Sequence, residues 1–431
     1  MTRFLAELAA RRRFGMKPGL DAIRSLCAAL GDPQKKLRAV HVAGTNGKGA
    51  VCAIIDACLL SAGFRTTRYT SPHLIALNER FCLNSIPISD KTLEKCAKTV
   101  ENSLRNWGQA PACDWGPAPK HIDEVTFFEA LTAVGFLAFA DAKPDLAILE
   151  CGLGGRLDAT NICEPVVCVI TKIGLDHCDW LGSTVEAITS EKAGIIKKGV
   201  PVVLGKNMPA VRDIVAAHAA AVGAPFVYAP ELASESEIPP DFSLAGAFNR
   251  ENAVTALAAL KTLARTSAPA FDPSSFANLP SPFSKVIWPG RFQRVRNFIV
   301  DGAHNPPAAQ ALSAALRELF PSGKALTMIA GFCGDKDVGG VLATLAPLVR
   351  RGLAVEIDNP RSLAATATAE AMRRAGIDAT PCASLADAIE AAGDSHTLIC
   401  GSLFLAGVAL VKLGAYPWLA VRRDPSELLH T

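Results

Sequence analysis

The chain has 431 residues, of which half are apolar and a fifth are charged. A chain of this length predicts two or three domains with sizeable buried cores. The formal net charge of +3, with no basic run interleaved with aromatic residues, argues against a nucleic-acid-binding surface. Thirteen cysteines without regular spacing predict reduced, mostly buried thiols in a cytoplasmic protein.

The stretch VHVAGTNGKG at residues 40–49 predicts a phosphate-binding loop. A short apolar run precedes Gly44, and apolar residues at helical spacing follow the loop as far as Gly63, which suits a helix end. In this order, strand, glycine-rich loop and helix let backbone N–H groups converge on phosphate oxygens. Lys48 would reach the terminal phosphates. Ala50 stands close behind it, so the hydroxyl that often binds magnesium in such loops is missing.

The chain then alternates between strands and helices up to about residue 205. Residues 107–125 have a loop-like composition, and a helix is predicted from Thr126 to Asp141, with Thr126 and Glu129 spaced as a capping box. Ser183 and Glu186 are predicted to begin the helix that carries Lys192. Further strands are predicted at residues 64–70, 145–150, 166–173 and 200–205.

Four polar side chains follow the ends of these predicted strands: Lys48, Ser71, Glu150 and His177. Because ligands bind at the carboxyl ends of strands in open parallel sheets, we expect these side chains to surround one nucleotide site. Hydroxyl and carboxylate oxygens suit Mg²⁺, whereas imidazole is a less usual ligand for it. Each residue taken alone also fits an ordinary turn or surface role.

A second, smaller α/β unit is predicted after an extended linker at residues 288–295. Within residues 296–431, NFIVDGAHNPP indicates a strand, a polar loop and a helix that starts near Pro306, and three more apolar runs follow. Asp301 and Asn305 suit either a ligand site or a turn with a helix N-cap. The apolar stretch at residues 403–421 contains Lys412 and Pro417 and predicts a buried helix, not a membrane span.

Eight motifs, in chain order, carry a resemblance that covers nearly the whole chain: HVAGTNGKG, YTSPHL, TFFEALT, ILECGLGGRLDATN, GLDHCDWLG, EKAGIIK, PGRFQ and DGAHNP. They resemble the signatures of folylpolyglutamate synthase and the bifunctional dihydrofolate synthase, within the Mur ligase superfamily. The resemblance implies a P-loop parallel-sheet ATPase domain at residues 1–287, followed by a Rossmann-like α/β ligase domain. It also implies a cytoplasmic monomer with no nucleic-acid or membrane partner.

The resemblance further implies ATP-dependent addition of L-glutamate to dihydropteroate, to folates or to both, through an acyl phosphate, with Mg²⁺ as the metal. The residues implied as ATP contacts are Gly44, Thr45, Asn46, Gly47, Lys48, Gly49, Asn252, Arg291 and Asp301. The implied metal ligands are Ser71, Glu150, His177 and Lys192, the last as a carbamate. The implied pterin-binding residues are Thr126, Phe127, Leu157, Asp158 and Ala159. The implied catalytic residues are Lys48, His177, Lys192, Arg291 and His304.

The chain departs from the family pattern at two places. Ala50 replaces a usual Ser or Thr, and FNRENA replaces a more common glutamine-containing segment around Asn252. The first departure removes a hydroxyl that could help to hold magnesium, and the second leaves the contact to adenine less firmly assigned.

Three competing functions can be weighed against the ligase. A nucleotide-dependent switch is disfavoured because Gly174 in TKIG stands where guanine recognition needs an aspartate. A Mur ligase acting on a peptidoglycan precursor is disfavoured by the loop GTNGKG and by the segment TSPH. A binding module without catalysis would not need magnesium ligands and Arg291 together.

Overall fold

The structure is a computed structural model that describes residues 3–10, 19–106, 125–266 and 281–418. The chain divides into two compact units, which are described separately. The first unit comprises residues 1–73, 77–241 and 251–286, and the second comprises residues 74–76, 242–250 and 287–431, as far as these are described. Most of the loop-like stretch predicted at residues 107–125 lies outside the described residues.

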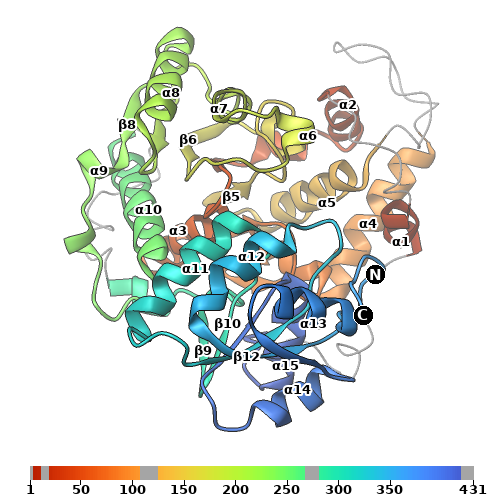
Figure 1. Ribbon diagram of the computed structural model, residues 1–431. Helices are drawn as coiled ribbons and strands as arrows, with labels where there is room; N and C mark the ends of the chain where they lie inside the picture. Colours follow the sequence, from red (N-terminus) through yellow and green to blue (C-terminus); the bar gives the residue numbers. More distant parts are fainter. Residues whose placement is uncertain (1–2, 11–18, 107–124, 267–280, 419–431) are drawn as a thin grey trace. The chain divides into compact units, whose positions relative to one another are not determined.

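The first unit is built on a sheet in the strand order β4-β3-β2-β5-β1-β6-β7-β8. Among its described strands, β3 alone runs opposite to the others. Its edge strand β8 lies beside α8 and α9 (Figure 1). The strands are β1 Ala39–Ala43, β2 Thr66–Tyr69, β3 Phe81–Leu83, β4 Ile86–Pro87, β5 Leu146–Glu150, β6 Pro165–Ile170, β7 Val202–Leu204 and β8 Phe226–Tyr228.

Helices cover this sheet and bury its central strands completely. Every residue of β1 and β5 is buried, as expected for parallel strands covered on both faces. The helices are α1 Arg3–Ala10, α2 Asp21–Ala29, α3 Lys48–Ser61, α4 Asp90–Arg105, α5 Phe127–Ala142, α6 Cys178–Leu181, α7 Val185–Ala193, α8 Pro209–Val222, α9 Ala229–Leu232 and α10 Ala247–Arg265. The short 3₁₀ turns are η2 Pro33–Lys36, η3 Leu77–Arg80, η6 Ala159–Ile162, η7 Glu235–Glu237 and η9 Ser281–Lys285.

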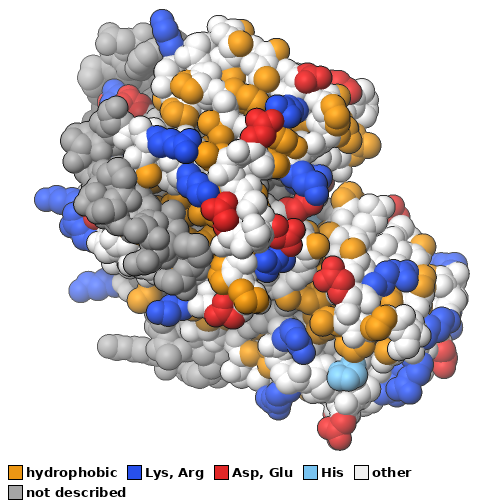
Figure 2. Space-filling model, turned by 90° about the vertical axis from the view of Figure 1, so that its left-hand side faces the viewer, with side chains coloured by type: hydrophobic (Ala, Val, Ile, Leu, Met, Phe, Trp, Pro, Cys, Tyr) orange, Lys and Arg blue, Asp and Glu red, His pale blue; other side chains and the backbone are white. Residues whose placement is uncertain are grey.

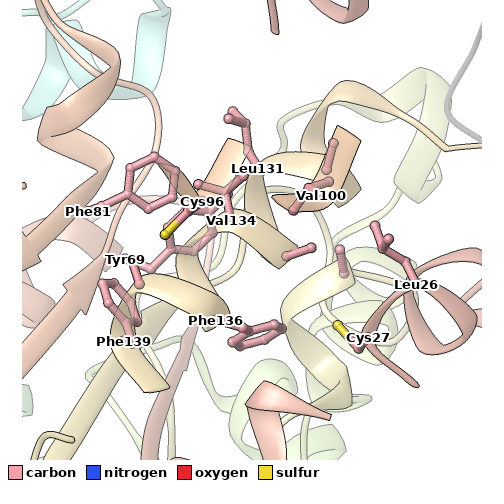
Figure 3. Packing of buried hydrophobic residues seen from close by; sticks show 14 of the residues in the cluster. Leu26, Cys27, Tyr69, Phe81, Cys96, Val100, Leu131, Val134, Phe136 and Phe139 are labelled. Atoms are coloured by element: carbon pink, nitrogen blue, oxygen red, sulfur yellow. The ribbon is translucent and has the colours of Figure 1, made fainter. Parts of the chain in front are cut away.

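The apolar core of the first unit centres on α5. Phe136 and Phe139 of α5 pack with Tyr69 of β2 and Leu26 of α2 in one buried cluster (Figure 3). The helix begins at the predicted capping box, in which the Thr126 hydroxyl and the Glu129 carboxylate each accept the other residue's backbone N–H. The predicted helix and its N-terminus are therefore confirmed.

The second unit has a sheet in the order β13-β12-β11-β14-β10-β9, in which β9 alone of the described strands is antiparallel. Its strands are β9 Gln293–Val295, β10 Phe298–Val300, β11 Leu326–Ala330, β12 Val349–Ala354, β13 Asp378–Pro381 and β14 Thr397–Cys400. Its helices are α11 Pro306–Leu319, α12 Val338–Leu345, α13 Ala365–Arg374, α14 Leu385–Ala392 and α15 Leu403–Lys412, with the 3₁₀ turn η10 Ala346–Leu348.

Alternation along β14 explains how both faces of the second sheet are covered. Leu398 and Cys400 belong to a cluster with residues of α11, α12 and α13. Ile399 points the other way and belongs to a cluster with α14 and α15. A Rossmann-like arrangement, with helices on two faces of a mostly parallel sheet, follows from this pattern.

Several predicted elements agree with the structure, and others do not. The strands predicted at residues 64–70, 145–150 and 200–205 contain β2, β5 and β7, and the strand predicted at 166–173 overlaps β6, which begins at Pro165. The predicted start of α7 at Ser183 and Glu186 is wrong, because Thr184 is the N-cap and its hydroxyl accepts the N–H of Ala187. Residues 293–295 of the predicted linker form β9 and pair with β10.

Helix length and surface charge can be compared with the predictions for part of the molecule. None of the described helices is long and apolar enough to cross a membrane. On the face drawn in Figure 2, the coloured Lys and Arg side chains are scattered among acidic and hydrophobic ones. The stretch predicted as a buried C-terminal helix contains α15, whose residues Leu405, Ala406 and Leu410 are buried.

Candidate active site

The phosphate loop joins β1 to α3 and depends on two glycines. Gly44 has φ +149°, and a Cβ there would lie 1.9 Å from Oγ1 of Thr171. Gly47 has φ +87°, and a Cβ there would lie 2.2 Å from Oδ1 of Asn252. An L side chain is strained in this part of φ space and has no room at either position. The predicted sequence of strand, glycine loop and helix is confirmed.

The segment after β6 fastens this loop in place. The backbone N–H groups of Thr45 and Asn46 both donate to the carbonyl of Lys172, at 2.9 and 3.2 Å. The Thr171 hydroxyl donates to the Asn46 carbonyl at 2.7 Å, and the Thr45 hydroxyl donates to the Gly174 carbonyl at 3.0 Å. Sequence reasoning missed Thr171, although it sits at the end of a predicted strand where such a contact is expected.

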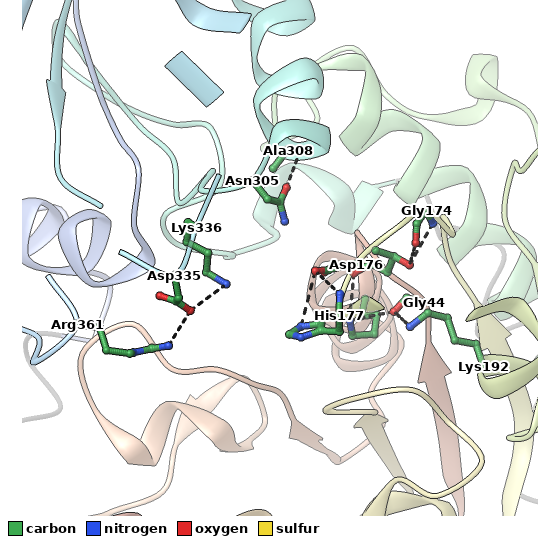
Figure 4. Close-up of polar contacts among 12 residues, drawn as sticks. Gly44, Gly174, Asp176, His177, Lys192, Asn305, Ala308, Asp335, Lys336 and Arg361 are labelled. Atoms are coloured by element: carbon green, nitrogen blue, oxygen red, sulfur yellow. Dashed lines mark hydrogen bonds and ion pairs between the residues drawn. The ribbon is translucent and has the colours of Figure 1, made fainter. Parts of the chain in front are cut away.

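Two lysines from different elements converge on one carbonyl of the loop. Lys48 of α3 donates from Nζ to the Gly44 carbonyl at 3.1 Å and to the Thr45 carbonyl at 3.2 Å. Lys192 of α7 donates to the same Gly44 carbonyl at 2.8 Å (Figure 4). Burial, and secondly the charge of Lys48, lower the pKa of Lys192 to about 7. Lys192 therefore holds a substantial fraction of neutral amine near neutral pH.

A pocket with about 290 Å³ of space, part of it open solvent, lies beside these lysines. His177 lines it from the loop after β6, with a side chain half exposed and a backbone φ of +51°. Asp176 is its neighbour, with Oδ1 3.9 Å from Nε2 of His177, and sequence reasoning did not single it out. The pocket is lined by Gly44, Thr45, Lys48, Cys151, Gly152, Leu153, Gly154, Asp176, His177, Leu181 and Lys192.

Ser71 and Glu150 meet at the ends of the neighbouring strands β2 and β5. The backbone N–H of Ser71 donates to Oε2 of Glu150 at 2.9 Å, and Glu150 is 3% exposed. No group of three or more His, Cys, Asp or Glu residues in the described ranges is arranged to hold a metal ion. Of the four predicted ligands, Ser71 and Glu150 are joined here, whereas His177 and Lys192 line the pocket. The Glu150 carboxylate and the Ser71 hydroxyl are oxygen donors of the kind that a hard cation takes.

Asp158, predicted to bind the pterin, fixes the glycine-rich loop that follows β5. Its Oδ2 accepts the N–H groups of Gly152 and Leu153, at 2.8 and 2.9 Å. Its Oδ1 accepts the N–H and the hydroxyl of Thr160. Burial raises the pKa of Asp158 above its ordinary value. The carboxylate already accepts four hydrogen bonds, so its clearest role here is to shape the pocket wall.

The other residues predicted to bind the pterin lie near the buried cluster around α5 in the first unit. Thr126 caps α5, Phe127 packs against the cluster, and Ala159 is part of it. Leu157 is half buried in the loop between Gly154 and Asp158.

In the second unit, the predicted site residues lie around the loop after β10. Asp301 is 6% exposed and accepts the N–H groups of Phe292 and Ala303, at 2.7 and 2.8 Å. Burial raises the pKa of Asp301, and the positive charge of Arg291 opposes that rise. Nδ1 of His304 lies 2.8 Å from the Gly302 carbonyl. Since a carbonyl only accepts, Nδ1 carries the proton there.

Two further polar groups lie in the loops that follow β10 and β11 of the second sheet. Asn305 is the N-cap of α11, because its side chain accepts the N–H of Ala308 at 2.9 Å. Asp335, in the loop after β11, lies 3.0 Å from Nη1 of Arg361 and 3.8 Å from Nζ of Lys336 (Figure 4). Sequence reasoning did not identify this second cluster.

Comparisons with known proteins identify the family. The glutamate ligase domain of the Mur ligases matches residues 290–403. A dihydrofolate synthase/folylpolyglutamate synthase of Bacillus subtilis is 34% identical over 375 residues, which cover 82% of this chain and 84% of that protein. The chain belongs to the folylpolyglutamate synthase/dihydrofolate synthase family. The predicted family and its ligase class are therefore confirmed, and they outweigh a role in peptidoglycan synthesis.

Solved structures of the folylpolyglutamate synthase family agree with this fold and carry nucleotides. The Mycobacterium tuberculosis folylpolyglutamate synthase complexed with ADP matches with a TM-score of 0.80 and 31% identity, covering 96% of this chain and 99% of that one. The bifunctional Yersinia pestis enzyme complexed with AMPPNP and Mn ion matches with a TM-score of 0.79 and 29% identity, covering 96% of this chain and 98% of that one. The predicted α/β fold class and the requirement for ATP with a divalent metal are consistent with these relatives.

Proposed function

We propose that this chain joins L-glutamate in an amide bond to the carboxylate of dihydropteroate, of a folate, or of both, and uses ATP to do so. The observation that carries this proposal is the pair Lys48 and Lys192, which meet at the Gly44 carbonyl beside the pocket. Lys48, as the cation of the phosphate loop, suits a reaction between two anions, the nucleotide and the acid substrate. Lys192, whose pKa is lowered to about 7, adds an amine that can be neutral or modified beside it.

The reaction balances as two displacements. A carboxylate oxygen of the pterin substrate attacks the γ-phosphorus of ATP, and ADP leaves. The neutral amino group of glutamate then attacks the acyl carbon, phosphate leaves with that oxygen, and the amine loses a proton. Positioning and charge neutralisation dominate such transfers. Lys48 would move from the loop carbonyls to the terminal phosphates, and the N–H groups at the start of α3 would support them.

The metal that this family uses would be held by Ser71 and Glu150, with His177 and a carbamylated Lys192 as further ligands. When bound, it would neutralise phosphate charge and orient the γ-phosphoryl group. Lys192 can join such a set only after its neutral amine has attacked CO₂ and lost a proton, which turns a cation into an anionic oxygen donor. The lowered pKa of Lys192 favours that reaction.

The remaining predicted residues have proposed roles in substrate binding. Arg291 would neutralise charge on the transferring group, and Asp301 would hold the Arg291–Phe292 backbone, as its hydrogen bonds suggest. His304 would help to place either the glutamate, whose amine can donate to Nε2, or the acyl phosphate, to which a protonated Nε2 would donate. Asn252 would contact the nucleotide. Residues assigned to the pterin are Thr126, Phe127, Leu157, Asp158 and Ala159.

A monomer in the reducing cytoplasm, without nucleic-acid or membrane partners, fits this activity. Every cysteine whose side chain is described is a free thiol, and nearly all of them are buried. Small-molecule substrates are the partners that the family's nucleotide complexes support.

The test uses the purified full chain with ATP and Mg²⁺. Phosphate release should require both L-glutamate and a pterin acid, and dihydropteroate and a tetrahydrofolate should be supplied separately to determine which is used. Phosphate release that depends on neither the pterin nor glutamate would contradict the proposal. Supplying a peptidoglycan precursor in place of the pterin tests whether the chain acts as a cell-wall ligase.

A further inference from the structure

Two segments of the first unit face each other with no space between them. One is the loop at residues 154–161, and the other is the last turn of α7 at residues 191–194. A Cβ on Gly155 would lie 2.8 Å from the carbonyl oxygen of Lys192. A Cβ on Gly194 would lie 2.3 Å from Cβ of Arg156. Each segment therefore contributes a glycine at the point of closest approach.

Hydrogen bonds cross this contact beside Lys192. The backbone N–H of Arg156 donates to the Glu191 carbonyl at 2.8 Å. The Arg156 guanidinium also pairs with Oε1 of Glu191 at 2.7 Å, but its side chain is 56% exposed, so solvent weakens this ion pair. The buried contacts therefore fix the distance between the two segments.

Asn161 makes the buried connection. Its Nδ2 donates to the Arg156 carbonyl at 2.9 Å and to the Gly194 carbonyl at 3.1 Å, one on each segment. The residue is 4% exposed, and its Oδ1 has no hydrogen-bond partner among the described residues. A buried acceptor without a partner lowers the free energy of unfolding. The Asn161 amide therefore carries a cost in stability at Oδ1, while both donors of Nδ2 are used.

We propose that Asn161 is a positioning residue for Lys192. It ties the carbonyl two residues beyond Lys192 to the loop at residues 154–161, and so holds the end of α7 where the Lys192 side chain reaches the Gly44 carbonyl. This inference rests on the proposed function, in which Lys192 acts at the nucleotide and metal site. Without the tie, only the Arg156–Glu191 backbone hydrogen bond and packing hold the last turn of α7 there, and Lys192 is less firmly positioned.

The test measures binding and needs no turnover. Calorimetry should give the affinity of a non-hydrolysable ATP analogue with Mg²⁺ for the unmodified chain, Asn161→Ala, Lys192→Ala and the double variant. We expect Asn161→Ala to weaken binding about tenfold when Lys192 is present and less than about twofold when it is absent, since residues acting through one contact are not additive. Asn161→Asp, which keeps the size but loses the two donors, should behave like Asn161→Ala.

The matched control is Asn297→Ala. Nδ2 of Asn297 also bridges two carbonyls, of Gly393 at 3.0 Å and of Ser395 at 2.9 Å, in the second unit. This variant should lower the unfolding temperature without changing the affinity for the analogue. An equal loss of affinity from Asn161→Ala in both Lys192 backgrounds, or no loss in folded Asn161→Asp, would overturn the positioning role. If the unmodified chain does not bind the analogue, the proposed function itself fails.

Discussion

Lys192 shares the Gly44 carbonyl with a second lysine and is 4% exposed. Such an ammonium group loses hydration and is repelled by its neighbour, so the folded chain favours the neutral amine. The same residue is the one that the proposed carbamate would convert into an anion. Its charge state therefore links stability to function.

Replacing Lys192 by Met should stabilise the metal-free protein in a pH-dependent way. The pKa of Lys192 is lowered on folding, so the unfolded state binds more protons between pH 10 and about 7. The stability gained by Lys192→Met should grow as the pH falls through this window, to the order of 2–4 kcal/mol, and level off below pH 7. Urea unfolding of both proteins across pH 6–10 measures this difference in the free energy of unfolding. A difference that does not change with pH would contradict the lowered pKa of Lys192.

Lys48→Ala should reduce turnover by at least about a hundredfold, because it removes the loop cation proposed to stabilise the transferring phosphoryl group. Its side chain contacts only loop carbonyls in the described contacts, so the fold should persist. Circular dichroism and steady-state ADP production give the two readouts. A folded variant with unchanged ADP production would refute the assignment of the phosphate loop.

At the scale of elements, α7 matters because it carries Lys192 and because its start differs from the prediction. Ser183 and Thr184 are both good N-cap residues and are adjacent, and Glu186, three residues after Ser183, makes Ser183 the predicted choice. The structure selects Thr184, which has extended backbone angles and a hydroxyl that accepts the N–H of Ala187. Helix α7 ends at Ala193, so Lys192 lies in its last turn.

Thr184→Ala should therefore cost about 1 kcal/mol of stability, whereas Ser183→Ala should cost less than about 0.5 kcal/mol. Chemical denaturation of the two variants beside the unmodified chain compares them directly. Equal losses, or a larger loss from Ser183→Ala, would mean that the helix starts one residue earlier.

Sequence patterns predict some elements of this fold and not others for physical reasons. The loop from Gly44 to Lys48 and the capping box at Thr126 are local signals, so they were predictable. The short strands β3, β4, β8 and β13 span two to four residues, too few for a periodic pattern. The role of Asp158 in holding two loop amides depends on backbone folding that spacing does not encode.

At the scale of the whole molecule, nucleotide binding should be visible as stability. A ligand that binds only the folded state stabilises it by about 2.7 kcal/mol at a hundredfold excess over its dissociation constant. The unfolding temperature should therefore rise with the logarithm of the Mg²⁺–ADP concentration. The rise should be much smaller in Lys48→Ala, and an unfolding temperature that ADP does not change would contradict nucleotide binding.

The central claim is that the acid substrate is activated by phosphorylation before glutamate attacks it. The most direct measurement supplies dihydropteroate or folate with ¹⁸O in its reacting carboxylate, together with ATP, Mg²⁺ and L-glutamate, and analyses the released phosphate by mass spectrometry. The account predicts one ¹⁸O atom transferred from carboxylate to phosphate in each turnover. Unlabelled phosphate accompanying the formation of glutamylated product would contradict it.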